Sequence, residues 1–179
     1  MRKLLLIFFC FSTLAIANAQ ETNNNNEENP YFGKQEVKLN ALFLIIGAVE
    51  VNYEYLLSEE SGIGISAFLP YDEEIKDNIQ YYISPYYRYY FGNKYAAGFF
   101  LEGFGMLNSS ERDLNFIFDN EEDNFITDFA LGIGLGGKWV TKSGFVGEIS
   151  YGIGRNLFKG DESEFDFIGK GGVTIAYRF

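Results

Sequence analysis

The chain has 179 residues, with 25 acidic against 14 basic side chains, no histidine, 18% aromatic residues and a net charge of −11. The missing histidine excludes Ser-His-Asp and Cys-His catalysis and every zinc site that uses histidine. The acidic balance argues against nucleic acid as a partner, because phosphate binding needs a basic face. Many aromatic residues and glycines with three prolines favour a β-rich protein.

The N-terminal segment Met1–Ala19 has the pattern of a secretory signal peptide. Arg2 and Lys3 give it a charged start, and Leu4–Phe11 is an apolar stretch too short for a spanning helix. Ala17-Asn18-Ala19 has the small-x-small pattern of a cleavage site. The sequence therefore predicts export and a cleaved signal.

The one cysteine, Cys10, lies within this apolar stretch and not at a lipoprotein cleavage site. Its removal with the signal leaves a mature chain that cannot form a disulfide, so we expect stability from packing or from closure of a sheet. The next segment, Gln20–Lys34, contains Asn23–Asn26 and almost no apolar residue, which predicts a disordered periplasmic lead-in.

From Gln35 to Phe179 the apolar residues alternate with period two, which predicts strands and no helix. Most of the predicted strands have ten residues or more, the length that crosses a bilayer at a tilt. The eight segments are Glu36–Ile46, Ala48–Leu57, Gly62–Pro70, Gln80–Phe91, Tyr95–Asn108, Asn124–Val140, Phe145–Gly154 and Phe165–Phe179.

The two faces of each predicted strand differ in polarity. In the second strand Val51 and Tyr53 alternate with Glu50, Asn52 and Glu54. A soluble barrel would turn the apolar face inward, whereas a membrane barrel turns it towards lipid and fills the lumen with the polar face. Alternation alone leaves both open. Strand length and a polar face of single charges mixed with small residues favour the membrane barrel.

Short and long connections also alternate along the chain. The three longer ones, Tyr71–Ile79, Ser109–Asp123 and Arg155–Glu164, fall on one side of the barrel and the short ones on the other, apart from a tight turn around Gly47. Outer-membrane barrels have short periplasmic turns and longer external loops. We therefore predict an all-β, eight-stranded antiparallel up-and-down transmembrane β-barrel.

Aromatic residues cluster at the predicted strand ends, as in the interfacial girdles of membrane barrels. The periplasmic set is Tyr53, Tyr55, Tyr87, Tyr89, Phe91, Tyr95, Trp139, Phe145, Tyr177 and Phe179. The outer set is Phe43, Tyr81, Tyr151 and Phe165.

The inward face of the predicted strands collects charges that an eight-stranded barrel has to pair internally, because side chains fill its interior. These residues are Lys38, Glu50, Glu54, Arg88, Glu102, Asp128, Lys138, Glu148, Asp166, Lys170 and Arg178. A narrow ion path is the alternative function of the set. Glu50, Glu54 and Glu102 as catalytic acids form a third hypothesis, which their spacing does not single out.

Two further patterns have both a functional and a structural interpretation. Asp119–Asn124 resembles the start of a calcium loop but lacks the glycine and the terminal acid of that motif, so a solvated acidic loop is expected. Gly132, Gly134 and Gly136 lie in a strand, which favours room for bulky inward neighbours (Tyr86, Phe100 and Phe104) over a phosphate loop.

Several short stretches resemble the small eight-stranded outer-membrane barrels, the OmpA/OmpX-like group, and within it an uncharacterised Gram-negative family of short secreted barrels. They are Lys38–Leu42, Val51–Leu56 and Ser84–Phe91. The terminal Ile175–Phe179, with Tyr177 and Phe179, is similar to the signal read by the outer-membrane barrel-assembly machinery. The resemblance implies the barrel fold and a location in the outer membrane. It also implies that membrane lipid and the assembly machinery are the partners, and it carries over no catalytic residue and no cofactor.

These observations predict a signal peptide (residues 1–19), a lead-in (20–34) and a barrel (35–179). The expected role is a non-enzymatic outer-membrane protein with structural or surface-interaction function through acidic external loops. Two alternatives stay open: a soluble periplasmic barrel that binds a small apolar ligand, and a lipid-modifying membrane enzyme.

Overall fold

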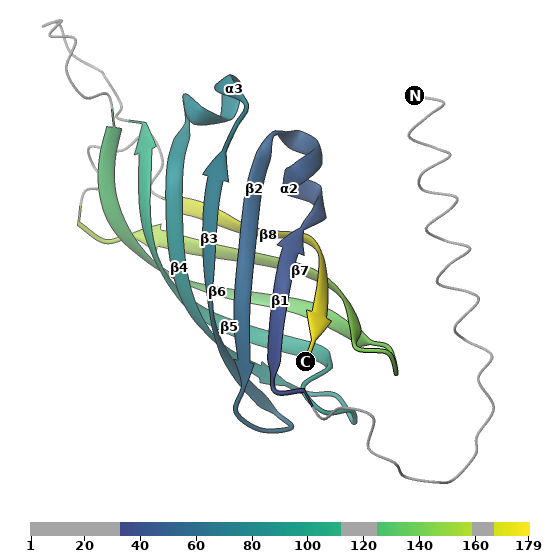
Figure 1. Cartoon of the computed structure of the whole chain (residues 1–179). Coiled ribbons are helices and arrows are strands. Elements are labelled where there is room, and N and C mark those ends of the chain that lie inside the picture. The colour runs from purple at the N-terminus through teal and green to yellow at the C-terminus, as the bar shows by residue number, and fades with distance from the viewer. Residues whose placement is uncertain (1–32, 112–124, 159–166) are drawn as a thin grey trace, which may run out of the picture.

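A computed structural model describes residues 33–111, 125–158 and 167–179. Eight antiparallel strands form a closed barrel in which sequential neighbours pair and β1 pairs with β8 (Figure 1). The strands are β1 Gln35–Asn40, β2 Ala48–Leu56, β3 Ser61–Pro70, β4 Ile79–Tyr90, β5 Gly98–Glu111, β6 Phe125–Val140, β7 Phe145–Asn156 and β8 Phe167–Arg178. The predicted eight-stranded antiparallel barrel is confirmed.

Some predicted features lie outside the described residues. These are the signal peptide with Cys10, the lead-in up to residue 32, the calcium-like Asp119–Asn124, the outer parts of the second and third longer loops, and Phe165 and Asp166. Among the residues that are described, no helix is long and apolar enough to cross a membrane.

The closing seam joins β1 to β8 along five residue pairs, from Glu36 with Arg178 to Asn40 with Thr174. Gln35 and Phe179 extend it, because each backbone amide donates to the other residue's carbonyl oxygen at 3.1 and 2.9 Å. Closure leaves no unpaired strand edge along this seam, so the barrel needs no disulfide to hold it.

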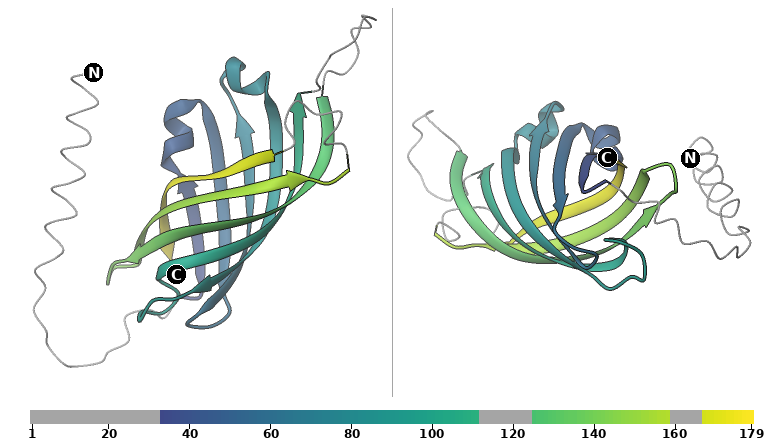
Figure 2. Two further views of the ribbon diagram at one scale, coloured as in Figure 1. Left: turned by 180° about the vertical axis from the view of Figure 1, so that it is seen from behind. Right: turned by 60° about the horizontal axis from the view of Figure 1, so that its bottom comes forward.

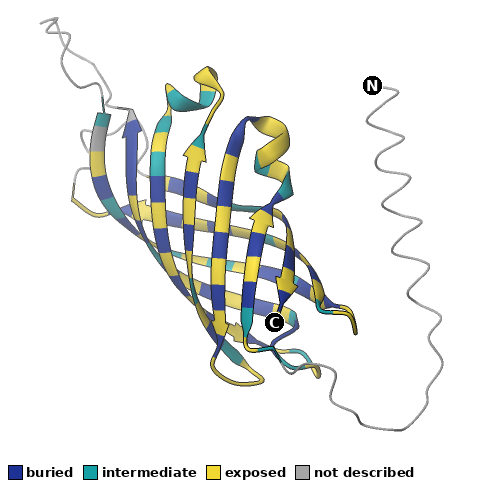
Figure 3. Ribbon diagram, viewed as in Figure 1, coloured by how far each residue is buried: buried dark blue, intermediate teal, exposed yellow. Residues whose placement is uncertain are grey.

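Burial alternates along every strand, which Figure 3 shows as bands of two colours. In β2 the polar Glu50, Asn52 and Glu54 are buried, while Val51 and Tyr53 are exposed. The same inversion holds around the barrel, since most of its buried polar residues are charged or amide side chains and its exposed face is aliphatic and aromatic. The interior is therefore polar and the exterior apolar.

The two ends of the barrel differ. The end where β1 begins and β8 ends, here the terminal end, carries the short connections 57–60, 91–97 and 141–144 (Figure 1). The opposite end, here the helical end, carries α2 (Ala41–Ile46) and α3 (Glu73–Lys76) (Figures 1 and 2). Both connections described at the helical end, residues 41–47 and 71–78, are longer than a tight turn.

Helix α2 corrects the prediction that the first strand continues to Ile46 and then turns tightly at Gly47. The Asn40 side chain accepts a hydrogen bond from the Phe43 amide at 3.4 Å, which caps the helix. Gly47 ends it in the left-handed conformation with φ of 115°. The apolar run Ala41–Ile46 has no alternation that distinguishes a strand from a helix. The two caps at its ends therefore decide that it is helical.

The start of β5 corrects a second prediction. The strand begins at Gly98 and not at Tyr95, and the preceding residues fold under the terminal end of the barrel. Ala96 and Ala97 are fully buried there, and Tyr95 packs against the cluster that contains Tyr90 and Phe100. Tyr95 is therefore not an outward aromatic residue, although it lies at the predicted end.

The inward glycines make room for large neighbours, as predicted. A Cβ atom on Gly132 would lie 2.2 Å from the Phe104 ring, and one on Gly136 would lie 2.5 Å from the Phe100 ring. A Cβ atom on Gly64 would likewise lie 2.3 Å from the Tyr86 ring. Each large ring thus fills the space that the directly paired glycine leaves on the neighbouring strand.

Candidate functional site

A single network of charged side chains occupies the middle of the lumen. Each strand except β3 contributes to it, and every member is at most 8% exposed. The members are Glu36, Lys38, Glu54, Arg88, Glu102, Lys138, Glu148, Lys170 and Arg178. On β3 the inward Gly62 instead leaves the space that the Glu54 carboxylate occupies.

The half of the network nearest the terminal end is built on Glu36. Its Oε1 atom accepts hydrogen bonds from both Arg178 Nε and Nη2, at 2.8 and 2.6 Å, so two charged donors converge on one carboxylate oxygen. Lys138 Nζ lies 2.9 Å from Glu36 and 3.2 Å from Glu54. The Tyr90 hydroxyl group also contacts Glu54 and Lys138, so a phenol completes this half.

The other half is built on Arg88. Its guanidinium group lies 2.6 Å from Glu102, 2.8 Å from Glu148 and 3.1 Å from Glu54. Lys170 Nζ donates to Glu102 at 2.9 Å, which extends the network to β8. One guanidinium group therefore bridges carboxylates on three strands, which its planar fork of donors permits.

Lys38 connects the two halves. Its Nζ atom lies 2.5 Å from Glu54 and 2.7 Å from Glu148. The same atom lies 3.2 Å from Glu36. Every carboxylate of the network thus has at least two cations within ion-pair distance, which compensates much of the cost of burial.

Aromatic rings add to the environment of the cations. The Arg88 guanidinium carbon lies 4.5 Å from the centre of the Tyr86 ring and 4.4 Å from that of Phe100. Lys170 Nζ lies 4.4 Å from the centre of the Tyr86 ring. These distances are within the range of cation–π attraction, which is stronger in a site that excludes water.

Apolar layers lie on both sides of the charges. In β4, Arg88 alternates with inward Tyr86 and Tyr90, and in β5 Glu102 alternates with inward Phe100 and Phe104. The layer towards the helical end contains Ala48, Phe68, Tyr82, Tyr86, Phe104, Met106, Ala130 and Ile168. Two clusters close the terminal end, one of Leu56, Tyr90, Ala96 and Phe100 and one of Ala97, Val140, Val146 and Ala176.

The predicted lumen residues divide between this network and the helical end. Glu50 lies nearer that end and accepts from Asn40 Nδ2 at 2.9 Å. Asp128 is buried near the start of β6 and accepts from the backbone amides of Phe129 and Phe158 at 2.6 and 3.1 Å. The remaining predicted residue, Asp166, lies outside the described residues.

The sequence-based set misses Glu36, which the structure places at the centre of the terminal half. The sequence does contain a feature that predicts its inward position: Glu36 lies two residues before Lys38 and therefore on the same face of β1. The amide and hydroxyl groups of Asn52 and Ser66, which hydrogen-bond to each other, are a second buried polar pair that charge alone does not reveal.

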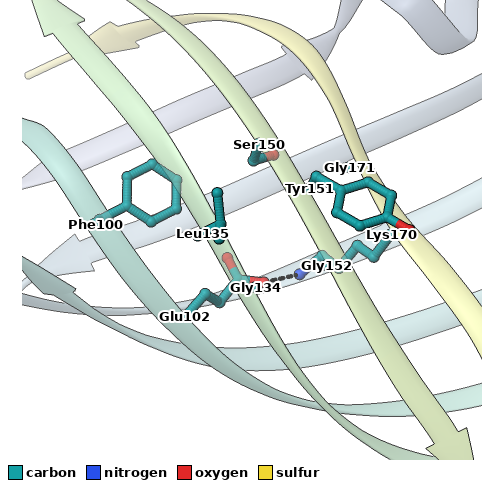
Figure 4. A pocket seen from close by; sticks show the side chains of 9 residues that line it. All are labelled: Phe100, Glu102, Gly134, Leu135, Ser150, Tyr151, Gly152, Lys170 and Gly171. Carbon is teal, nitrogen blue, oxygen red and sulfur yellow. Dashed lines mark hydrogen bonds and ion pairs between the residues drawn. The ribbon is translucent and has the colours of Figure 1, made fainter.

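A small cavity lies inside the lumen. It has a volume of about 10 Å³, on the order of one water molecule, and lies beside the Glu102–Lys170 ion pair (Figure 4). Glu54 and Glu102 both pair with Arg88, so neither carboxylate is placed as a free acid or base for a substrate. In the described part of the chain, no three metal-ligating side chains are grouped as a metal site.

The predicted interfacial aromatic residues point outward near the terminal end. Their side chains are between 39% and 60% exposed, and the set comprises Tyr53, Tyr55, Tyr87, Tyr89, Phe91, Trp139, Tyr177 and Phe179. Tyr177 and Phe179, predicted as an assembly signal, are both on this outer face, whereas Arg178 between them points into the lumen.

The fold and its filled lumen define a class: closed eight-stranded barrels with a charged interior and an apolar exterior. Within that class, the chain belongs to the family described as "Protein of unknown function (DUF3575)", whose model matches residues 4–174. A search of curated proteins gives no match.

Two solved structures are similar to the chain. The N-terminal β-barrel domain of Pseudomonas aeruginosa OprF has a TM-score of 0.56 and 14% identity, over 81% of this chain and 95% of that domain. The Yersinia pestis outer membrane protein Ail, determined in a phospholipid bilayer nanodisc, has a TM-score of 0.40 and 16% identity, over 82% of this chain and 99% of Ail. The likeness to the OprF domain supports the barrel fold.

Proposed function

We propose that this chain is an integral outer-membrane β-barrel protein without enzymatic activity, which acts as a structural scaffold and presents acidic loops at the cell surface. The observation that carries the proposal is the inverted polarity of the barrel. Its outward strand positions are mostly aliphatic or aromatic, and its inward positions hold the paired charges. A soluble protein rarely exposes a contiguous apolar patch above a few hundred Å², whereas lipid requires such a surface.

The strand dimensions agree with a bilayer. β4, β7 and β8 have 12 residues each, and about 9–11 tilted residues cross the hydrocarbon core. The outward aromatic residues at the terminal end correspond to an interfacial girdle. In this arrangement the terminal end faces the periplasm, and the signal peptide of residues 1–19 directs the chain to export.

A role as a scaffold follows from the filled lumen. Buried ion pairs and aromatic layers occupy the space that a channel or an apolar ligand would need. Specificity then belongs to the loops at the helical end, with the acidic residues 111–123 as the strongest charge cluster of the sequence. Tyr177 and Phe179 are assigned to recognition by the barrel-assembly machinery.

The test is cell fractionation of the full chain, combined with gel migration of boiled and unboiled samples. We expect the protein in the outer-membrane fraction, soluble only with detergent, and a shift in migration on boiling because a closed barrel resists the detergent at low temperature. Recovery in the soluble periplasmic extract without detergent would contradict the proposal and favour a soluble barrel. An altered lipid A profile in cells that carry the gene would instead favour a lipid-modifying enzyme.

A further inference from the structure

Among the strand residues whose side chains the structure describes, one charged side chain lies on the outer surface of the barrel. Arg155 is at an outward position of β7, in line with Tyr151 and Ile153. At the other outward strand positions whose side chains are described, every residue is uncharged. Within the described residues no carboxylate forms an ion pair with Arg155, and its cross-strand partners Leu131 and Phe167 are apolar.

The surroundings of Arg155 form a groove on the outside of β6, β7 and β8. Figure 2 (left) shows these three strands side by side, in green and yellow. Its volume is about 320 Å³, and the side chains that line it besides Arg155 are Leu131, Ile133, Ile153 and Phe167. Cross-strand pairing places Arg155 directly between Leu131 and Phe167. Gly169 pairs with Ile153 and has open space where a side chain would lie, which extends the hollow.

The height of Arg155 matches the second surface of a bilayer. On the same strand, Phe145 belongs to the aromatic residues at the terminal end, ten residues away. Ten residues span about 33 Å along a strand, or about 25 Å across the membrane at a tilt of about 40°. That separation equals the height of the apolar band of an outer-membrane barrel, so Arg155 lies where lipid headgroups begin.

We infer that Arg155 and this groove bind a phosphate-bearing lipid of the outer leaflet. The headgroup phosphate accepts hydrogen bonds from the guanidinium group, and an acyl chain lies along Leu131, Ile133 and Ile153. The guanidinium fork matches phosphate geometry, and the apolar groove is suited to a hydrocarbon chain and not to a charged peptide. The inference rests on the proposed membrane location and adds a ligand and a site to it.

The test is native mass spectrometry of the purified full chain in detergent, titrated with dipalmitoylphosphatidylglycerol. We expect Arg155→Gln to weaken binding at least about fivefold, because a charge-assisted phosphate contact is lost. The matched control is Lys94→Gln, which removes one positive charge from the exposed turn at the terminal end and should leave the affinity unchanged. Dipalmitoylglycerol, which lacks phosphate, should bind more weakly than the phospholipid.

Three results would overturn the inference: equal affinity of the wild type and Arg155→Gln, equal binding of dipalmitoylglycerol, or full competition by glycerol phosphate, which would indicate a site for a free anion. Binding in detergent is independent of cellular location. A protein found in the periplasmic extract would therefore refute the proposed function, whereas a membrane-bound protein with unchanged Arg155→Gln affinity would refute only the lipid site.

Discussion

At the residue scale, Glu54 has three cationic neighbours, as many as Glu36. Lys38, Arg88 and Lys138 all lie within 3.2 Å of its oxygens. Removal of one partner from a buried ion cluster is costly, because the remaining charges stay out of water without compensation.

We therefore expect Glu54→Gln to lower the free energy of unfolding by about 3–5 kcal/mol. The substitution keeps the size of the side chain, so the loss reports charge and not packing. Urea unfolding of the protein in lipid vesicles, followed by tryptophan fluorescence, measures it. The control Glu59→Gln, in an exposed turn, should change stability by less than about 0.5 kcal/mol. Equal effects of the two variants would show that the network is energetically unimportant.

Two glycines of neighbouring strands give a second matched pair. A Cβ atom on inward Gly132 would meet the Phe104 ring at 2.2 Å, and one on outward Gly103 would meet no atom within 4 Å. We expect Gly132→Ala to destabilise the barrel by about 1–3 kcal/mol through overpacking. Gly103→Ala should be neutral or slightly stabilising. Thermal unfolding of both variants in one detergent gives the comparison, and similar midpoints would contradict it.

The period-two alternation predicts which face of a strand a side chain takes, and it predicts an inward position for Lys38, Arg88 and Lys138, which are buried. Period does not predict which charges meet. Arg88 meets Glu102 because the two are paired across β4 and β5, but it meets Glu148 only because closure of the barrel brings β7 across the lumen from β4. That geometry belongs to the closed barrel and is absent from any single strand.

At the element scale, the turn between β4 and β5 is part of the closure of the barrel. Arg178 Nη1 donates to the Tyr95 carbonyl oxygen at 2.9 Å, and Nη2 donates to that of Ala96 at 3.0 Å. The Ala96 amide donates to the backbone carbonyl oxygen of Glu59, in the neighbouring turn, at 2.7 Å. One guanidinium group thus joins β8, the Glu36 carboxylate and the turn that covers the lumen.

We expect Arg178→Lys to keep the charge beside Glu36 but to release the turn, because a single ammonium group cannot reach three acceptors in a fork geometry. Amide hydrogen exchange at Ala96 should accelerate at least about tenfold, which corresponds to about 1.4 kcal/mol of local stability. The amide of Leu101, within β5, serves as the internal control. Unchanged exchange at Ala96 would show that packing alone holds the turn.

Strands whose apolar and polar residues alternate clearly are predicted well from the sequence. The helix whose ends are set by capping residues is not. The bounds of β2 and β3 agree with the sequence to within one residue. Helix α2 was missed because six consecutive apolar and small residues fit a buried strand equally well. Only Asn40 as a cap and Gly47 in a left-handed conformation decide the outcome.

At the scale of the whole molecule, apolar layers bound the ion network on both sides. Tyr86 and Phe104 lie on one side, and Tyr90 and Phe100 on the other. An ion that entered would have to part these rings and then displace a member of a saturated network. We expect the reconstituted protein to give no stepwise ion current in a planar lipid bilayer, with a porin in the same bilayer as the positive control. Reproducible conductance steps would refute a purely structural lumen.

The single network has a consequence for how such a barrel changes over evolutionary time. A substitution of one lumen charge alters the balance on several strands at once, so its tolerated replacements depend on residues far away in the sequence. Positions such as Lys38 and Glu148, 110 residues apart, should therefore covary among relatives. Outward positions such as Ile149 need only remain apolar, so their substitutions among relatives should be independent of those at other positions. The inside and outside of the same strand thus follow different evolutionary rules.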